Sequence, residues 1–317
     1  VQRPQVGRAP QLTWAARNPE EGVVPFLLSG KQLHGSAGRK VWLLDFDDTL
    51  FASSAGLLHE VHLRMNAFMT ERMGMSEEEA NRLRSHYWQT YGSTFIGLWR
   101  RHGVDPKVFL PAVHDFDYAP FVQNAPQLRR LLAKLPGRRV LYSNGPRLYV
   151  ERLLPALGLR NFFHAIVSST DMRLFGDWRP KPNVSMLRAV CARLKTRPAD
   201  AVLVDDSLMN LKAGKAAGLA TVWCVGLRRK HAGLLLPAGT PAKLPEVDLV
   251  VRNVADLVRR AHLLCTWRDL MTVLKCLWRV LDFCRRLVLN LIFLAVLVAA
   301  ARIWWFDRPT TPPEKPG

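Results

Sequence analysis

The sequence has few cysteines and no collagen-like repeat, and each shortage excludes a class of protein. Its five cysteines include no C-x-x-C pair and stand at positions 191, 224, 265, 276 and 284. A disulfide framework and a structural zinc site are therefore not expected, and a reducing compartment suits the chain best. The 20 glycines and 21 prolines follow no G-X-Y period, which excludes a collagen-like fold.

Acidic residues are also scarce. There are 26 of them against 45 lysines and arginines, which gives a formal net charge of +19. Such a charge suits nucleic acid, an anionic membrane or a phosphorylated substrate, and charge alone does not choose among them. The basic residues are scattered, and residues 226–231 come nearest to a basic block. We read that run as a solvated surface and expect no specific nucleic-acid partner.

The chain does have ample apolar material in a repeating order. Hydrophobic residues make up 49% of it, and from residue 39 onward short apolar runs alternate with helical patterns. The runs are residues 41–46, 140–143, 165–168, 201–205, 221–225 and 248–251. The helical patterns are residues 127–135, 147–157, 184–194 and 208–217. This alternation predicts a doubly wound α/β fold with a parallel sheet buried on both faces.

Other segments break this rhythm. Residues 57–119 have a helical pattern without a strand, which predicts a helical insert after the first strand. The α/β core is then formed by residues 39–56 and 120–262. Outside the core we expect an irregular arm at 1–38, an amphipathic basic helix at 263–286, a hydrophobic helix at 287–306 and a Pro-rich tail at 307–317. The first residue is Val1 and not Met, which leaves open whether residues precede it.

Acidic pairs follow two of the predicted strands, where an α/β sheet places its ligand site. Asp45 and Asp47 stand at the end of the first strand, and Asp205 and Asp206 at the end of the fourth. Converging carboxylates repel one another, so the pattern suits a metal ion or a division of roles between anion and proton carrier. For the first pair alone, a helix N-cap cluster is an alternative.

Two further polar features fall at strand ends. The second strand stops at Ser143 and Asn144, before a glycine, where backbone N–H groups at a helix start can meet an anion. Lys181 follows the third strand between two prolines, a setting poorly suited to helix or sheet. Taken singly, these features are typical of a turn and a solvated loop lysine. Together, however, the strand ends place two acidic pairs, a hydroxyl and a lysine at one edge of a sheet. These are the groups that metal-assisted phosphoryl transfer needs.

In this order the residues resemble the four motifs of the haloacid dehalogenase (HAD) superfamily. The resemblance covers roughly residues 39–226 and implies a Rossmann-like sheet with a cap. Within the superfamily the chain is most similar to the pyrimidine 5′-nucleotidase group, on the stretches 91–94, 97–98, 102–105, 114–117 and 135–140. The gap between Asp48 and Ser143 is the longer one, so the helical insert takes the place of the family's subclass I cap.

The resemblance implies a Mg²⁺-dependent phosphomonoester hydrolase that works through an aspartyl-phosphate. Asp45 is the implied nucleophile, and Asp47 the implied general acid and base. Ser143 and Asn144 are implied to bind the phosphoryl oxygens, and Lys181 to bind them and to neutralise charge during catalysis. The implied metal ligands are Asp45, Asp47 through its backbone carbonyl, Asp205 and Asp206.

The implied substrate is a nucleoside 5′-monophosphate, with a pyrimidine base favoured by the cap stretches. Two alternatives stay open. One is a general phosphatase of sugar phosphates or phosphoglycolate, and the other is a catalytically idle, membrane-tethered binding module. Asp47 favours phosphatase or phosphomutase chemistry, because dehalogenases and P-type ATPases place other residues at that position. The complete motif set argues against an idle domain.

The C-terminal segment is apolar enough to suggest a membrane anchor. A spanning helix needs about 20 mostly apolar residues, and residues 287–306 supply that length. Residues 278–291 resemble the membrane anchor of bacterial signal peptide peptidases. Arg279, Arg285 and Arg286 precede the apolar run, which predicts a catalytic domain on the cytoplasmic side of the inner membrane. The alternative is a helix packed on the soluble domain.

Overall fold

The computed structural model describes residues 40–122, 126–227, 244–264 and 267–306. The chain divides into two compact units, the first ending at Ala261 and the second beginning at His262. The predicted arm at 1–38, the predicted tail at 307–317 and most of the basic run at 226–231 lie outside the described residues.

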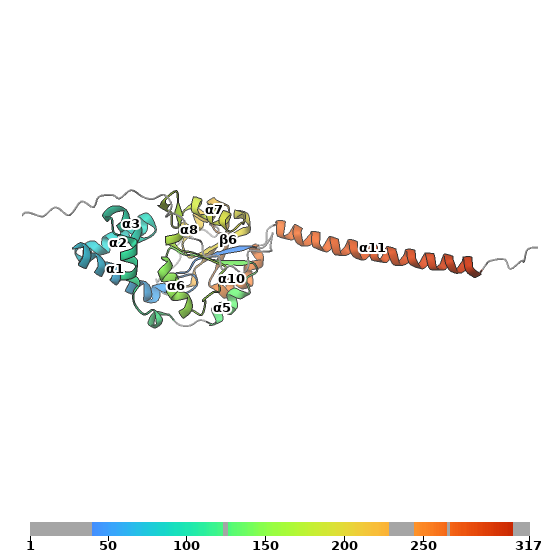
Figure 1. The fold of residues 1–317 in the computed structure, drawn as a ribbon, viewed down its shortest axis with the longest axis horizontal. Helices are drawn as coiled ribbons and strands as arrows, with labels where there is room; N and C mark the ends of the chain where they lie inside the picture. The colour runs from blue at the N-terminus through green and yellow to red at the C-terminus, as the bar shows by residue number, and fades with distance from the viewer. Residues whose placement is uncertain (1–39, 123–125, 228–243, 265–266, 307–317) are drawn as a thin grey trace, which may run out of the picture. The chain divides into compact units, whose positions relative to one another are not determined.

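A six-stranded parallel sheet is the centre of the first unit (Figure 1). In spatial order its strands are β3 (Ala165–Val167), β2 (Arg138–Tyr142), β1 (Val41–Leu44), β6 (Ala201–Asp205), β7 (Ala220–Cys224) and β8 (Leu249–Val251). Each of the six apolar runs predicted as strands overlaps one of these strands. The predicted doubly wound α/β fold is therefore confirmed.

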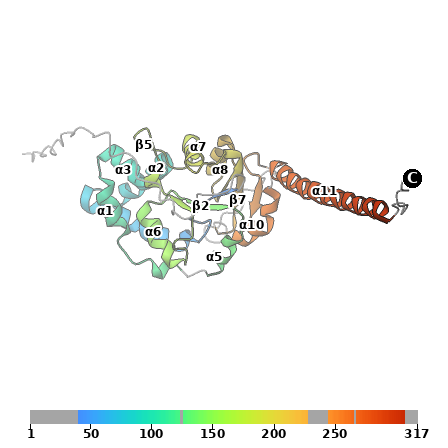
Figure 2. The same cartoon turned by 45° about the vertical axis from the view of Figure 1, so that its right-hand side comes forward.

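Helices cover both faces of this sheet (Figure 2). Figures 1 and 2 show α7 (Val184–Arg193) and α8 (Leu208–Ala217) on one face, and on the other α5 (Pro126–Ala133), α6 (Arg147–Ala156) and α10 (Val254–Arg260). Alternate side chains of a strand point to opposite faces, so only half of β1 meets each layer. Val41 and Leu43 share an apolar cluster with residues of α7 and α8. All four residues of β1 are fully buried, as expected for a central strand.

A helical insert separates β1 from β2. It contains α1 (Leu57–Met73), α2 (Glu77–Tyr91), α3 (Thr94–His102) and α4 (Pro106–His114). Helix α1 packs against α2 and α4, and α2 against α3. Polar caps help to define the helix starts: the Ser76 side chain accepts a hydrogen bond from the Glu79 N–H at the start of α2. The insert therefore has the helical character that the sequence predicts.

A short antiparallel hairpin, for which the sequence analysis predicted no strands, joins the insert to the core. It consists of β4 (Arg173–Leu174) and β5 (Asp177–Trp178). Arg100 of α3 forms an ion pair with Asp177. The Trp99 and Trp178 rings meet edge to face, with their centroids 4.6 Å apart. The hairpin therefore holds one side of the insert against the core.

The second unit consists mainly of one long helix, α11 (Trp267–Phe306). Within the described residues, the segment Leu277–Arg302 is the one helix long and apolar enough to cross a membrane, with a mean hydropathy of 2.1. Its large apolar side chains are exposed. This helix confirms the predicted C-terminal hydrophobic helix.

Candidate active site

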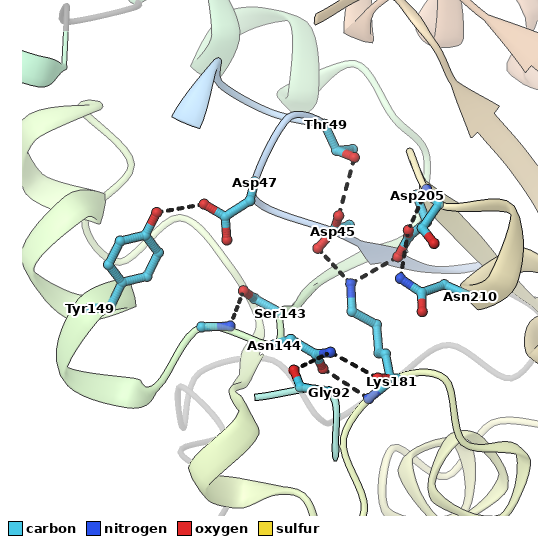
Figure 3. A network of polar contacts seen from close by, with 12 residues as sticks. Asp45, Asp47, Thr49, Gly92, Ser143, Asn144, Tyr149, Lys181, Asp205 and Asn210 are labelled. Carbon is cyan, nitrogen blue, oxygen red and sulfur yellow. Dashed lines mark hydrogen bonds and ion pairs between the residues drawn. The ribbon is translucent and has the colours of Figure 1, made fainter. Parts of the chain in front are cut away.

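Asp45 is the first residue after β1 and lies at the carboxyl edge of the sheet (Figure 3). Its backbone N–H donates to the Val204 carbonyl at 2.9 Å, which continues the pairing with β6 and fixes the position of the side chain. The Lys181 Nζ donates to Asp45 Oδ1 at 2.6 Å and to Asp205 Oδ2 at 2.8 Å. The Thr49 hydroxyl donates to the other Asp45 oxygen at 3.3 Å. Strand ends therefore bring the predicted nucleophile, lysine and second acidic pair together.

Lys181 is a buried residue, not the solvated loop lysine that its sequence setting suggests by itself. Its side chain is only 3% exposed, in the loop between β5 and α7. Burial alone would lower the pKa of Lys181, but Asp205 and Asp45 outweigh this effect and raise the pKa well above its ordinary value. The lysine is therefore a permanent positive charge between two carboxylates.

Three carboxylates converge beside this lysine. Each of Asp45, Asp205 and Asp206 offers one oxygen, and these oxygens lie within 4.8 Å of one another. Burial, followed by the charge of Asp205, raises the pKa of Asp45 well above its ordinary value, and Lys181 opposes this shift. The three carboxylates lie close enough together to share one cation.

The donor set of this cluster fits a divalent cation such as Mg²⁺. All three donors are carboxylate oxygens, the ligands that hard cations prefer. The second oxygen of Asp205 accepts hydrogen bonds from the Ser207 N–H at 2.9 Å and from Asn210 Nδ2 at 2.8 Å. These two donors orient Asp205 within the cluster. The predicted role of the Asp47 backbone carbonyl as a ligand stays a prediction.

Asp47 has a different environment from the carboxylate cluster. Its Oδ1 accepts a hydrogen bond from the Tyr149 hydroxyl at 2.5 Å. Burial raises the pKa of Asp47 to about 6, although the Tyr149 hydrogen bond acts in the opposite direction. Burial, followed by the charge of Asp47, raises the pKa of Tyr149 well above its ordinary value, so the phenol stays a donor. A carboxyl that titrates near neutrality can both give and take a proton.

Neither acid of the first pair caps a helix, so the N-cap alternative is wrong. Asp48 Oδ1 accepts hydrogen bonds from the Ser54 N–H at 3.0 Å and the Ser54 hydroxyl at 2.8 Å. It thereby organises the short 3-10 turn Ser53–Ala55. Helix α1 begins without a side-chain cap. Asp45 bonds Lys181, and Asp47 bonds Tyr149 and Ser53.

Ser143 and Asn144 follow β2, but their side chains have different surroundings. Ser143 is buried, and its hydroxyl accepts the Gly145 N–H at 2.9 Å. Asn144 Oδ1 accepts the Lys181 N–H at 2.8 Å, while Nδ2 donates to the carbonyls of Lys181 and Gly92. Both ends of the Asn144 carboxamide are therefore engaged by backbone groups.

Gly92 is the point at which the insert reaches Asn144 and Lys181. It ends α2 with a φ of +73°, in the left-handed region. A Cβ there would lie 2.6 Å from the Lys181 carbonyl oxygen, so the close approach requires glycine. The insert therefore touches the loop that carries the buried lysine.

The sequence analysis missed two residues that complete the site. Asn210 lies in the first turn of α8, and Tyr149 in the first turn of α6. Tyr149 sits in an apolar helical pattern, where an aromatic residue is typical of the core. No spacing in the sequence signalled that either side chain meets an acidic residue.

The model of the haloacid dehalogenase-like hydrolase family matches residues 40–218. The chain belongs to this family. The matched residues include each of the four acids, the serine, the asparagine and the lysine described above. The helical insert between β1 and β2 is the cap of the family's first subclass.

Several known proteins resemble the chain. Validoxylamine A 7′-phosphate phosphatase of Streptomyces hygroscopicus subsp. limoneus is 26% identical, over 48% of this chain and 63% of that protein. The chain thus spans less than two thirds of this relative. Phosphoglycolate phosphatase of Chromobacterium violaceum is 25% identical, over 69% of this chain and 94% of that protein. A solved haloacid dehalogenase-like hydrolase from Burkholderia xenovorans is 22% identical with a TM-score of 0.49, over 73% and 100% of the two chains.

Proposed function

We propose that the protein is a Mg²⁺-dependent phosphomonoester hydrolase that works through an aspartyl-phosphate. The observation that carries this proposal is the contact of Lys181 with both Asp45 and Asp205, beside a separate Asp47 bound by Tyr149. This arrangement offers an anionic nucleophile, a fixed positive charge and a carboxyl that titrates near neutrality. The names of two relatives, both phosphatases, support the same reaction class.

The proposed reaction has two steps. In the first, an Asp45 oxygen attacks phosphorus while Asp47 gives its proton to the leaving oxygen. In the second, Asp47 takes a proton from a water molecule, which attacks phosphorus and releases inorganic phosphate from Asp45. These steps need one carboxyl that acts first as an acid and then as a base.

Other residues of the site control charge and orientation during this reaction. Lys181 offsets the repulsion between Asp45 and the phosphate dianion, and the Ser143 hydroxyl and the Asn144 N–H orient the phosphoryl oxygens. Asp45, Asp205, Asp206 and the Asp47 carbonyl would hold Mg²⁺. When bound, Mg²⁺ supplies positive charge that stabilises the transferring phosphoryl group. The cap excludes bulk water from the site.

The substrate class that we propose is a small phosphomonoester. Similarity in the cap to pyrimidine 5′-nucleotidases favours UMP or CMP. The names of the relatives favour a sugar phosphate or phosphoglycolate. An idle binding module is the less favoured alternative, because the structure retains both the acid next to Lys181 and the carboxyl next to Tyr149.

A screen of phosphomonoesters with Mg²⁺ and with EDTA tests the proposed function. We expect turnover that requires Mg²⁺. A ranking headed by UMP and CMP would support the nucleotidase, whereas a ranking headed by sugar phosphates or phosphoglycolate would support a general phosphatase. Absence of turnover across the screen would contradict the proposal and favour the idle module.

Replacing Asp47 with asparagine is expected to slow turnover by roughly 10²- to 10⁴-fold, the usual contribution of a general acid or base. Both half-reactions should slow for an alkyl phosphate. Phosphorylation by p-nitrophenyl phosphate should be less affected, because its leaving group needs no proton. Rapid mixing separates the two half-reactions.

The adjacent Asp48→Asn variant is the matched control for this prediction. Asparagine can still accept the Ser54 hydrogen bonds that Asp48 accepts. We therefore expect near wild-type kinetics from it. Equal slowing of phosphorylation by alkyl and p-nitrophenyl phosphates in Asp47→Asn would rule out the acid role.

We also propose that α11 spans the inner membrane, with the catalytic unit on the cytoplasmic side. The exposed apolar helix supports a span over residues 287–306, and Arg279, Arg285 and Arg286, which precede that run, support the orientation. The full chain is expected to stay with membranes after alkaline carbonate extraction. Release by carbonate would show that the helix does not span the bilayer.

A charge in the middle of this helix provides the control. Leu294→Arg should weaken the insertion of this helix into the membrane by about 2.5–3.5 kcal/mol and shift the protein to the soluble fraction. Leu294→Ile should behave like wild type. Equal membrane retention of the two variants would contradict the spanning helix.

A further inference from the structure

Tyr149 is a buried residue that points at Asp47 from the side away from Asp45 (Figure 3). Its hydroxyl donates to Asp47 Oδ1 at 2.5 Å, across 102 positions of sequence. A phenol has an ordinary pKa of about 10 and is a donor at neutral pH. Hydrogen bonds from a hydroxyl to a carboxylate are short and strong. The tyrosine can therefore fix the orientation of the Asp47 carboxyl.

The Tyr149 ring is itself held by neighbouring groups. Ring centroids of His114, Tyr118 and Phe46 lie 5.5, 5.9 and 6.4 Å from it. His114 Nδ1 and the Tyr118 hydroxyl are hydrogen bonded to each other at 2.9 Å. On another side, a Cβ at Gly145 would lie 2.6 Å from the Tyr149 ring. The hydroxyl therefore has little freedom to move away from Asp47.

Asp47 takes its side-chain hydrogen bonds from Tyr149 and Ser53 and not from Lys181. The hydrogen bonds of the Lys181 ammonium go to Asp45 and Asp205. An aspartate side chain has two rotatable bonds, and proton transfer requires hydrogen-bond reach to the leaving oxygen. A displacement of about 1 Å can cost 10²-fold in rate.

We propose that Tyr149 positions Asp47 for catalysis: it holds Oδ1, so that Oδ2 is the oxygen that exchanges a proton with the leaving group. Tyr149 is thus a positioning residue that acts through Asp47. The inference rests on the proposed function, since it assigns a support to the general acid of that reaction.

The test compares two esters in wild type and in Tyr149→Phe, which keeps the ring and removes the hydroxyl. One ester is an alkyl phosphate, glycerol phosphate, whose leaving group needs a proton. The other is p-nitrophenyl phosphate, whose leaving group does not. The measured quantity is kcat/KM, because it reports the steps up to departure of the leaving group. We expect about a 10²-fold loss for the alkyl ester and little change for the aryl ester.

Two further variants separate positioning from a general structural effect. Tyr118→Phe removes a hydroxyl that bonds His114 and not Asp47, so the ratio of the two kcat/KM values should stay at the wild-type value. In an Asp47→Asn background, Tyr149→Phe should cause no further loss for the alkyl ester, because the two residues act as one unit.

The outcomes distinguish the inference from the proposed function. Wild-type protein that hydrolyses neither ester would overturn the proposed function and the inference with it. Wild-type protein that hydrolyses both esters, together with an unchanged kcat/KM ratio in Tyr149→Phe, would overturn the inference alone. A loss in Tyr149→Phe that persists undiminished in the Asp47→Asn background would overturn it as well.

Discussion

Replacing Asp45 with asparagine is expected to lower phosphomonoester turnover by roughly 10⁴- to 10⁶-fold, a loss typical of removing an enzyme's nucleophile. Asparagine keeps the shape of the side chain but has no anionic oxygen to attack phosphorus. The fold should tolerate the change, because Asp45 shares a buried site with Asp205 and Asp206. We expect the free energy of unfolding without Mg²⁺ to be unchanged or higher.

Steady-state assays and urea unfolding check these two expectations together. Acid quenching after mixing with a phosphate-labelled substrate should trap label on wild type and none on Asp45→Asn. Asp48→Asn again serves as the control, since Asp48 binds the 3-10 turn and not the centre of the site. Wild-type turnover in Asp45→Asn would remove Asp45 from its role as nucleophile.

Replacing Lys181 with methionine should have the largest effect on stability. The change leaves Asp45 and Asp205 buried without their positive partner, and breaking a buried pair in this way costs about 3–5 kcal/mol. Turnover should fall by about 10²- to 10³-fold, comparable to the loss of one charge-stabilising donor. Urea unfolding without Mg²⁺ and steady-state assays measure the two effects.

Lys215 offers a matched control for Lys181. Lys215 lies in α8 and pairs with Asp248, which lies in the loop before β8. Both side chains are substantially exposed. A surface pair of this kind contributes about 0–1 kcal/mol, so Lys215→Met should unfold almost as wild type does. Equal free energies of unfolding for Lys181→Met and Lys215→Met would contradict the buried charge pairing.

The sheet and the main contacts of the site could be predicted from the sequence because the signals are local. Each central strand is a short apolar run that stops at a polar residue, as β1 does at Asp45 and β6 at Asp205. Carboxyl ends of parallel strands meet at one edge of a sheet. The common edge could therefore be expected from the sequence, and the pairing of β1 with β6 is what brings Asp45 and Asp205 close together.

The remaining contacts depend on residues far apart in the chain. Each strand of the β4–β5 hairpin has two residues, too few to show alternation, and the hairpin meets Arg100 and Trp99 of the cap. Asn144 was predicted from its motif to bind phosphate, yet its carboxamide joins Gly92 and Lys181. Contacts of this kind leave no local periodicity for a sequence argument to detect.

The central place of β1 also has a consequence during synthesis. Of the strands that the structure describes, β1 is the first to leave the ribosome, and it ends at Leu44 while its neighbour β2 begins at Arg138. At about 5–20 residues per second, roughly 5–20 s pass before that neighbour exists. The cap helices are translated in this interval, while the four apolar residues of β1 have no sheet to join. We expect the nascent chain to be a client of ribosome-bound chaperones at residues 41–44, and the cap to acquire helical structure before the core that carries it.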